Sequence, residues 1–354
     1  MEPFVGIGTK EIDELRRAIG SDDLDRVKML MTRNPALHGA PIGYGRSGPL
    51  TCVAEFTATE GRESAALAMA AWMIEHGSDV HQGGDGPLMR AALSRQRIPM
   101  MELLVSHGAD VNAEWHGEYP VIFAACEAVD PVTLKWLLDR GANPNCDKPL
   151  RAHQGTALDY VVGAYVRSPD LGACIDILLS AGGRTKYDAP VVLELLRGRL
   201  DGVKEYLRDD PELVSARFDG LDCGATGGRL LTLRGATLLH VAAEYGSVDG
   251  IRLLLSQGAD VNGRATVDDA GVGGQTPIFH AVTQLDDHGV LTTQLLIERG
   301  ADLSIRVRVP GHYERPGEVV ECTPLGYALT FQDVPTRSDK ANTVKLLREH
   351  GAIE

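Results

Sequence analysis

Residues 235–262 carry hydrophobic positions with the spacing of two short helices. Apolar side chains fall on one helical face before Gly246 and again on one face after it, at Leu238, Val241, Ala242, Ile251, Leu254 and Leu255. Each predicted helix is shorter than the roughly 12–15 residues at which an isolated helix becomes marginally stable, so each needs a neighbour to pack against. Gly258 follows the second helix where a left-handed cap is expected, a conformation that glycine adopts without steric cost. The pattern predicts a helix-turn-helix unit within an array of similar units.

The end of this unit recurs along the chain. A glycine, usually followed by a small residue, marks the end of a repeat at Gly77, Gly108, Gly141, Gly182, Gly258, Gly300 and Gly351. The first two intervals are 31 and 33 residues, whereas those that end at Gly182, Gly300 and Gly351 are 41, 42 and 51 residues. Because a packed helix pair cannot absorb extra residues and keep its register, the additional residues are expected in loops.

Two further units end in Pro-x-Leu instead of glycine. Residues 24–28 followed by Pro35 and Leu37 match residues 200–204 followed by Pro211 and Leu213, at a constant offset of 176 residues. We therefore predict about nine repeats in two halves. Residues 1–186 begin with an atypical capping repeat, and residues 187–354 contain the long loops. The two halves form either one continuous solenoid or two arcs that meet at a bend near Tyr187.

The unit at residues 235–262 resembles an ankyrin repeat, in its Thr-Leu-Leu-His-Val-Ala-Ala start and in its Gly-Ala-Asp-Val-Asn end. The resemblance implies an all-α fold, an ankyrin-repeat solenoid of helix-turn-helix units over nearly the whole chain, with β-hairpin-like finger loops beside a concave groove. It also implies that His240 is structural and bonds to the backbone between adjacent repeats. Proteins of this family act mainly as binding surfaces for other proteins.

Three long insertions fall in consecutive repeats of the second half. We name them the first finger (residues 218–235), the second finger (264–275) and the third finger (304–321). Alternating Arg and aliphatic residues at 305–309, followed by Pro310 and Gly311, predict a β-hairpin in the third finger. Such fingers would stand side by side, and long loops in repeat proteins are usually functional or disordered. We interpret them as functional; the alternative is solvated loops whose charges pair among themselves.

The repeat motif predicts which residues line the groove beneath the fingers. In the motif His-x-Ala-Ala the position x tends to face the groove; Phe279 takes the His slot in the next repeat, so His280 takes position x, and Tyr327 does so in the last repeat. Aromatic and Arg side chains dominate binding hot spots. The candidate binding residues are therefore Tyr245, Arg264, His280, Arg306, His312, Tyr313, Arg315 and Tyr327. Packing between repeats is the alternative for each of them.

Charge and composition narrow the possible functions. The net charge of −14 argues against nucleic acid, which requires clustered Lys and Arg. The first residues lack the features of a signal peptide, and no apolar run approaches the roughly 18 residues of a membrane span, so we expect a cytoplasmic protein that does not bind membranes. Six scattered cysteines without Cys-x-x-Cys spacing predict reduced thiols, mostly in the core.

The sequence lacks several common catalytic motifs. It contains no His-Glu-x-x-His, no Walker motif and no Gly-x-Ser-x-Gly. Metal-ligand residue types between His312 and Cys322 lack the spacing of a tight tetrahedral site. We therefore assign no catalytic residue, metal or cofactor, and an enzyme is the less favoured class.

Three hypotheses for the function remain. The first is a cytoplasmic interaction module that binds a protein partner or peptide along the concave face and the fingers. The second is a small-molecule-binding protein or enzyme, in which fingers carrying Arg229, Arg264 and Arg315 close over His280 and Tyr327, and His280 pairs with a finger carboxylate. The third is a bacterial effector delivered into a host cell, since such export does not require a cleavable signal.

Overall fold

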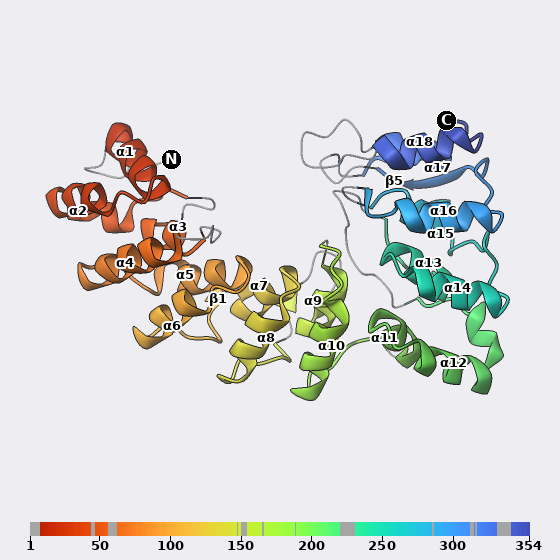
Figure 1. The fold of residues 1–354 in the computed structure, drawn as a ribbon, viewed down its shortest axis with the longest axis horizontal. Helices are drawn as coiled ribbons and strands as arrows, with labels where there is room; N and C mark the ends of the chain where they lie inside the picture. The colour runs from red at the N-terminus through yellow and green to blue at the C-terminus, as the bar shows by residue number, and fades with distance from the viewer. Residues whose placement is uncertain are drawn as a thin grey trace. The chain divides into compact units, whose positions relative to one another are not determined.

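The computed structural model of the chain describes residues 8–43, 47–55, 62–146, 148–149, 154–164, 166–187, 189–219, 231–284, 287–311, 315, 317–330 and 341–354. These residues form nine helix pairs in chain order (Figure 1). The first helices of the pairs are α1 (Thr9–Gly20), α3 (Pro49–Glu55), α5 (Gln82–Leu93), α7 (Val121–Glu127), α9 (Ala157–Gly163), α11 (Pro190–Leu196), α13 (Leu238–Glu244), α15 (Pro277–Ala281) and α17 (Pro324–Thr330). The second helices are α2 (Leu24–Arg33), α4 (Arg62–Glu75), α6 (Ile98–Ser106), α8 (Pro131–Leu138), α10 (Leu171–Ser180), α12 (Leu200–Asp209), α14 (Val248–Ser256), α16 (Val290–Glu298) and α18 (Ala341–Glu349). The predicted all-α array of about nine helix-turn-helix repeats is confirmed.

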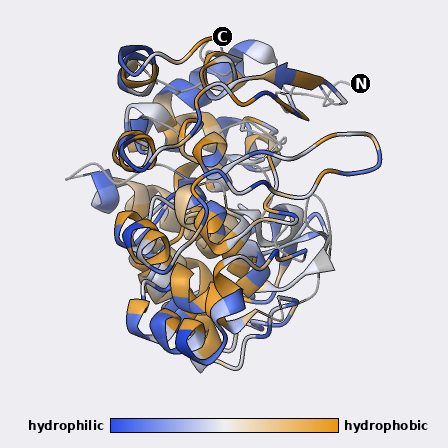
Figure 2. Ribbon diagram, turned by 90° about the vertical axis from the view of Figure 1, so that its right-hand side faces the viewer, coloured by the Kyte–Doolittle hydropathy of each residue, from blue (hydrophilic) through white to orange (hydrophobic). Residues whose placement is uncertain are grey.

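The pair α13–α14 shows why this sequence forms two short helices. Ser247 caps α14 by accepting a hydrogen bond from the backbone N–H of Gly250. Gly258 follows α14 with φ of +92°, which confirms the predicted left-handed cap. All seven residues of α13 are buried, whereas α14 buries only one side. The helices of the second unit accordingly carry hydrophobic and hydrophilic sides in Figure 2.

The chain forms two compact units. The first comprises Met1–Pro149, Gln154–Leu158 and Ile177–Arg184, and the second comprises Leu150–His153, Asp159–Asp176 and Thr185–Glu354. In the first unit α3 packs on α5 and α5 packs on α7. In the second unit α11 packs on α13, α13 on α15, and α15 on α17, and these pairs stack in chain order from green to blue in Figure 1. The division of the repeats at residues 186 and 187 stays a prediction.

The two Pro-x-Leu units have the same local structure. Asn34 follows α2, and Asp210 follows α12, with backbone angles that agree to within a few degrees: φ −134° and ψ 87° against φ −139° and ψ 91°. A 3₁₀-helix follows each, η1 (Pro35–Gly39) and η3 (Pro211–Val214). Each proline stops its helix because the residue before it is forced out of the α region.

Short antiparallel strands connect some of the pairs. They are β1 (Glu114–Trp115) with β2 (Tyr119–Pro120), β3 (Lys148–Pro149) with β4 (Gln154–Gly155), and β5 (Val307–Pro310) with β6 (Val319–Cys322). In the last pair, Val307 lies opposite Cys322 and Pro310 lies opposite Val319, which confirms the hairpin predicted for the third finger. Across the described residues, no helix is long and apolar enough to cross a membrane.

Candidate functional site

The second finger is a loop whose two sides are joined by backbone hydrogen bonds. The N–H of Ala265 donates to the carbonyl of Gln275 at 2.9 Å. Near its tip Gly273 has φ of +123°, and a Cβ atom there would lie 2.2 Å from the carbonyl oxygen of Thr266. Only glycine fits this position, because any other residue is both strained and in collision with the opposite side of the loop.

Successive fingers also pair with one another. The N–H of Thr266 in the second finger donates to the carbonyl of Gly235 at the end of the first, at 3.2 Å. The N–H of Gly273 in turn donates to the carbonyl of Arg308 in β5, at 2.7 Å. At both junctions the returning side of one finger meets the outgoing side of the next. The expectation that the fingers stand side by side is confirmed for their described residues.

The predicted arginines lie on the surface of the fingers and at their bases. Arg264, Arg306 and Arg315 are all exposed. Arg315 pairs with Glu318 at 2.8 Å, and Arg306 donates to the backbone carbonyl of Glu354. The structure gives Arg264 no side-chain hydrogen bond among the described residues. Its guanidinium group is therefore the most available of the three. His312, Tyr313 and Arg229 lie outside the described residues.

His280 and Tyr327 do not face an open groove, which corrects the expectation for both. Each side chain is 0% exposed. The Nδ1 atom of His280 lies 2.7 Å from the carboxylate of Glu244. The hydroxyl of Tyr327 donates to the carbonyl of Pro310 at 3.2 Å, and its ring packs on Phe279. Both side chains lie in the core, where Nδ1 of His280 and the hydroxyl of Tyr327 bond to neighbouring groups.

Glu244 is the centre of a buried polar cluster that the sequence analysis missed. Its carboxylate accepts hydrogen bonds from Arg167 at 2.7 Å and from Gln284 at 3.3 Å, and its other oxygen faces His280. The side chain of Glu244 is 2% exposed and that of Arg167 is 13% exposed. A buried carboxylate needs such partners, because an isolated charge in the interior is strongly unfavourable. Arg167 lies in the α9–α10 loop, where no motif marks it.

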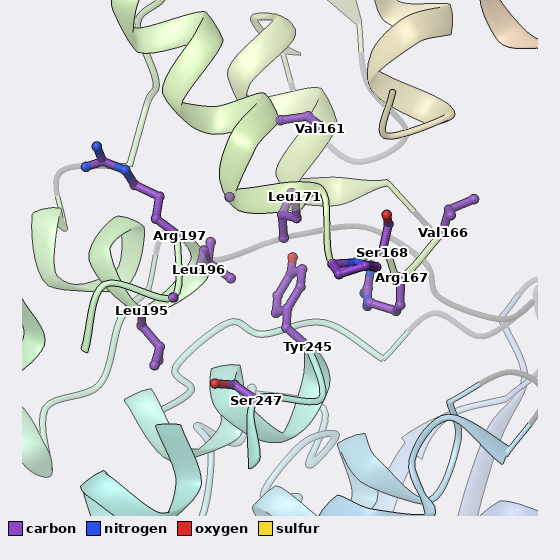
Figure 3. A pocket seen from close by; sticks show the side chains of 13 residues that line it. Val161, Val166, Arg167, Ser168, Leu171, Leu195, Leu196, Arg197, Tyr245 and Ser247 are labelled. Carbon is purple, nitrogen blue, oxygen red and sulfur yellow. The ribbon is translucent and has the colours of Figure 1, made fainter. Parts of the chain in front are cut away.

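Tyr245, at the end of α13, lies against the same loop. Its hydroxyl donates to the carbonyl of Val162, and the guanidinium of Arg167 stacks 4.4 Å from the ring centroid. Figure 3 shows the ring entering a pocket beside Leu171 and Leu196. The cavity volume is about 220 Å³.

This pocket is poorly suited to binding a small molecule. Ligand pockets usually measure about 300–1,000 Å³, so 220 Å³ is below that range. The Tyr245 hydroxyl and the Arg167 guanidinium already bond inside the protein. The cavity therefore favours ordered water over a drug-sized ligand.

His240 has the structural role that the resemblance implies. The N–H of Thr237 donates to Nδ1 of His240 at 3.1 Å, so Nε2 carries the proton and donates to the carbonyl of Gln275 at 2.9 Å. Burial, and secondarily the nearby ring of His280, lower the pKa of His240 to about 3. The neutral ring thus ties α13 to the second finger of the next repeat.

A second surface pocket, which the sequence analysis also missed, lies in the first unit. The guanidinium of Arg90 lies 5.7 Å from the ring centroid of Trp115, and the hydroxyl of Tyr119 donates to Glu127 at 2.6 Å. These side chains line a cavity of about 150 Å³. Their residue types are those of binding hot spots. The signal in the sequence is the aromatic pair on either side of Gly117, in an interval of ordinary length.

Comparison with known proteins gives the following matches. The model of the family described as ankyrin repeats (3 copies) matches residues 197–307, and the model described as ankyrin repeat matches residues 83–115. Among solved structures, the human ASB11 ankyrin repeat domain is similar, with 19% sequence identity and a TM-score of 0.36, over 87% of this chain and 100% of that chain. No curated protein matches the chain significantly.

Proposed function

We propose, on the premise that this chain is an ankyrin repeat protein, that it is an interaction module whose partner protein binds along the second and third fingers and the concave face beside them. Ankyrin repeats generally bind other proteins. The finger surface is the specific part of this proposal.

The observation that supports it is the hydrogen bonding between fingers. Thr266 bonds to Gly235, and Gly273 bonds to Arg308, so these long loops are tied together before any partner arrives. A surface that is already ordered loses less conformational entropy on binding. The same fingers expose two aliphatic side chains, Val267 at 52% and Val319 at 40%. Ordered backbone that exposes apolar side chains favours a binding surface over a solvated loop.

The small-molecule hypothesis lacks comparable support. It requires His280 and Tyr327 to line a pocket under the fingers, and both side chains are fully buried. His280 does meet a carboxylate, but this is Glu244 of α13 and not a residue of a finger. We therefore do not propose catalysis at His280.

Affinity capture with matched variants tests the proposal. The double variant Arg264→Ala, Val267→Ser alters the second finger, and the control Arg252→Ala, Leu291→Ser alters exposed residues of the same types on α14 and α16. A partner protein identified with the wild type should bind the finger variant at least about tenfold more weakly, which is the effect of losing one hot spot. The control should bind like the wild type. Equal loss in both variants, or no loss in either, would contradict a finger interface.

A further inference from the structure

One edge of strand β6 in the third finger has no partner among the described residues. The N–H of Gly311 donates to the carbonyl of Glu318 at 2.9 Å, and hydrogen-bonded pairs alternate along an antiparallel ladder. It follows that Val319 and Glu321 direct their N–H and C=O groups away from β5. Among the residues that the structure describes, no group bonds to them.

The fingers themselves indicate what belongs at this edge. The end of the first finger meets the outgoing side of the second at Thr266, and the returning side of the second meets β5 at Arg308. β6 is the returning side of the third finger. Over the described residues 323–330 and 341–354 the chain forms α17 and α18, and no strand there pairs with β6. No described residue thus fills the position that the next outgoing strand would take.

We propose that an extended segment of the partner protein adds to β6 as an antiparallel strand. This inference rests on the proposed function, and it specifies the binding mode. The segment would supply the backbone partners that Val319 and Glu321 lack, which is the source of affinity when a peptide extends a sheet edge. The β6 sequence Val-Val-Glu-Cys contains neither the proline nor the lysine with which natural edge strands discourage such pairing.

The side chains beside this edge indicate the chemistry of the segment. Val319 is 40% exposed and Glu321 is exposed, two positions further along the same face. Neighbouring strands favour opposite charges and matched apolar pairs. The partner segment should therefore place Arg or Lys beside Glu321 and an apolar residue beside Val319. Strand β5 already has this arrangement on the other side, with Arg308 opposite Glu321.

A second copy of this chain is a poorer occupant. Pairing β6 with itself would bring Glu318 and Glu321 of two molecules together, and each molecule carries a net charge of −14. Like charges on neighbouring strands, and on the two molecules as a whole, oppose association. A cationic segment is attracted by the same field.

Amide hydrogen exchange measured by NMR on the full chain tests the edge. In the free protein the amides of Val319 and Glu321 should exchange fast, whereas the amide of Val320, which points toward β5, should exchange slowly. The probe is a capped synthetic peptide with the sequence of residues 304–310, Ser-Ile-Arg-Val-Arg-Val-Pro. It should protect Val319 and Glu321, and a peptide with Glu in place of both Arg should bind about fivefold more weakly.

Substitutions in β6 complete the test. Val319→Pro removes one edge N–H at the first position of the strand, where proline is tolerated, and should weaken the Arg peptide about tenfold; Val319→Thr keeps the N–H and should bind like the wild type. Glu321→Arg should reverse the preference between the two peptides.

Slow exchange at Val319 and Glu321 in the free protein would mean that the edge is already covered, and would overturn the inference. Failure of both peptides to bind would also overturn it. If the captured partner binds Val319→Pro normally but loses affinity for the Arg264→Ala, Val267→Ser variant, the edge inference fails and the proposed function stands.

Discussion

At the scale of single residues, Glu244 of α13 holds together side chains from three other parts of the second unit. Arg167 reaches it from the α9–α10 loop, His280 from α15 and Gln284 from the turn after α15. Removing one partner of a buried ion pair leaves the other charge uncompensated in the interior. The cluster is thus a point at which one substitution affects several repeats.

Replacing Glu244 should destabilise the protein strongly. We expect Glu244→Ala to lower the free energy of unfolding by about 3–5 kcal/mol, because Arg167 loses its buried carboxylate. The control is Asp249→Ala, which breaks an exposed pair with Arg252 and should cost less than about 1 kcal/mol. Urea unfolding measures both. Similar losses in the two variants would contradict the role assigned to the cluster.

His240 makes stability depend on pH. Its pKa in the folded protein is about 3, well below the ordinary 6.5. The unfolded chain therefore binds a proton below pH 6.5 that the folded chain does not, and stability falls as the pH falls from 6.5 toward 3. At about 1.4 kcal/mol per pH unit, this residue alone should remove roughly 2 kcal/mol between pH 6.5 and pH 5.

Unfolding free energies measured at several pH values check this expectation. His240→Gln should flatten the decrease between pH 6.5 and pH 5, whereas Gln in place of the exposed His350 should leave it unchanged. Parallel curves for the wild type and His240→Gln would show that other groups cause the acid sensitivity.

At the scale of elements, the glycines after the second helices set where each repeat ends. Gly258 has φ of +92°, and a Cβ atom there would meet no atom within 4 Å. A substitution there therefore lowers stability through strain in the left-handed backbone conformation, and not through a clash with a neighbouring residue. Gly258→Val should lower the free energy of unfolding by about 1–2 kcal/mol, since a β-branched residue resists the left-handed region.

Gly20 provides the matched control for this prediction. It lies in α1, outside the left-handed region, and also has open space around its Cβ position. Gly20→Ala should be neutral or should stabilise by up to about 1 kcal/mol. Denaturant unfolding compares the two, and equal effects would contradict the assigned helix end.

The sequence predicted the hairpin of the third finger, but it did not predict the burial of His280. The alternation at residues 305–309 predicted the hairpin, because strand periodicity is a local property. The repeat motif placed His280 on the inner helix, but exposure depends on what lies against that face. In the structure His280 is fully buried, and its Nδ1 atom lies 2.7 Å from Glu244. The motif predicts which side of the helix a side chain lies on, and the neighbouring repeats determine whether that side is exposed to solvent.

At the scale of the whole molecule, contacts within the second unit extend beyond adjacent repeats. Arg167 and Val162 belong to the α9–α10 repeat, yet they bond to Glu244 and Tyr245 at the end of α13. The α11–α12 repeat lies between them in sequence. In a simple solenoid each repeat contacts only its neighbours, so stability is a sum of nearest-neighbour terms. This contact is an exception to that rule.

Two fragments should reveal the exception. Residues 154–354 keep Arg167 and Val162, whereas residues 187–354, which begin at the predicted division of the repeats, lose both. We expect the longer fragment to be more stable by roughly 3 kcal/mol or more, and Arg167→Ala to remove much of that difference. Thermal and urea unfolding provide the comparison. A longer fragment that is insensitive to Arg167→Ala would show that this contact contributes little.

The sequence alone determined the helix pairs, their capping glycines, the structural histidine and the hairpin of the third finger. The family resemblance implied the role of the histidine, and the others depend on residues close together in the chain, through helical spacing, turn geometry or strand alternation. Only the tertiary structure decided which side chains are buried and which fingers pair. Arg167 and Glu244 are 77 residues apart, and Gly273 and Arg308 belong to different repeats. Such contacts depend on how several repeats stack, and a local sequence pattern does not show which distant residues the stacking brings into contact.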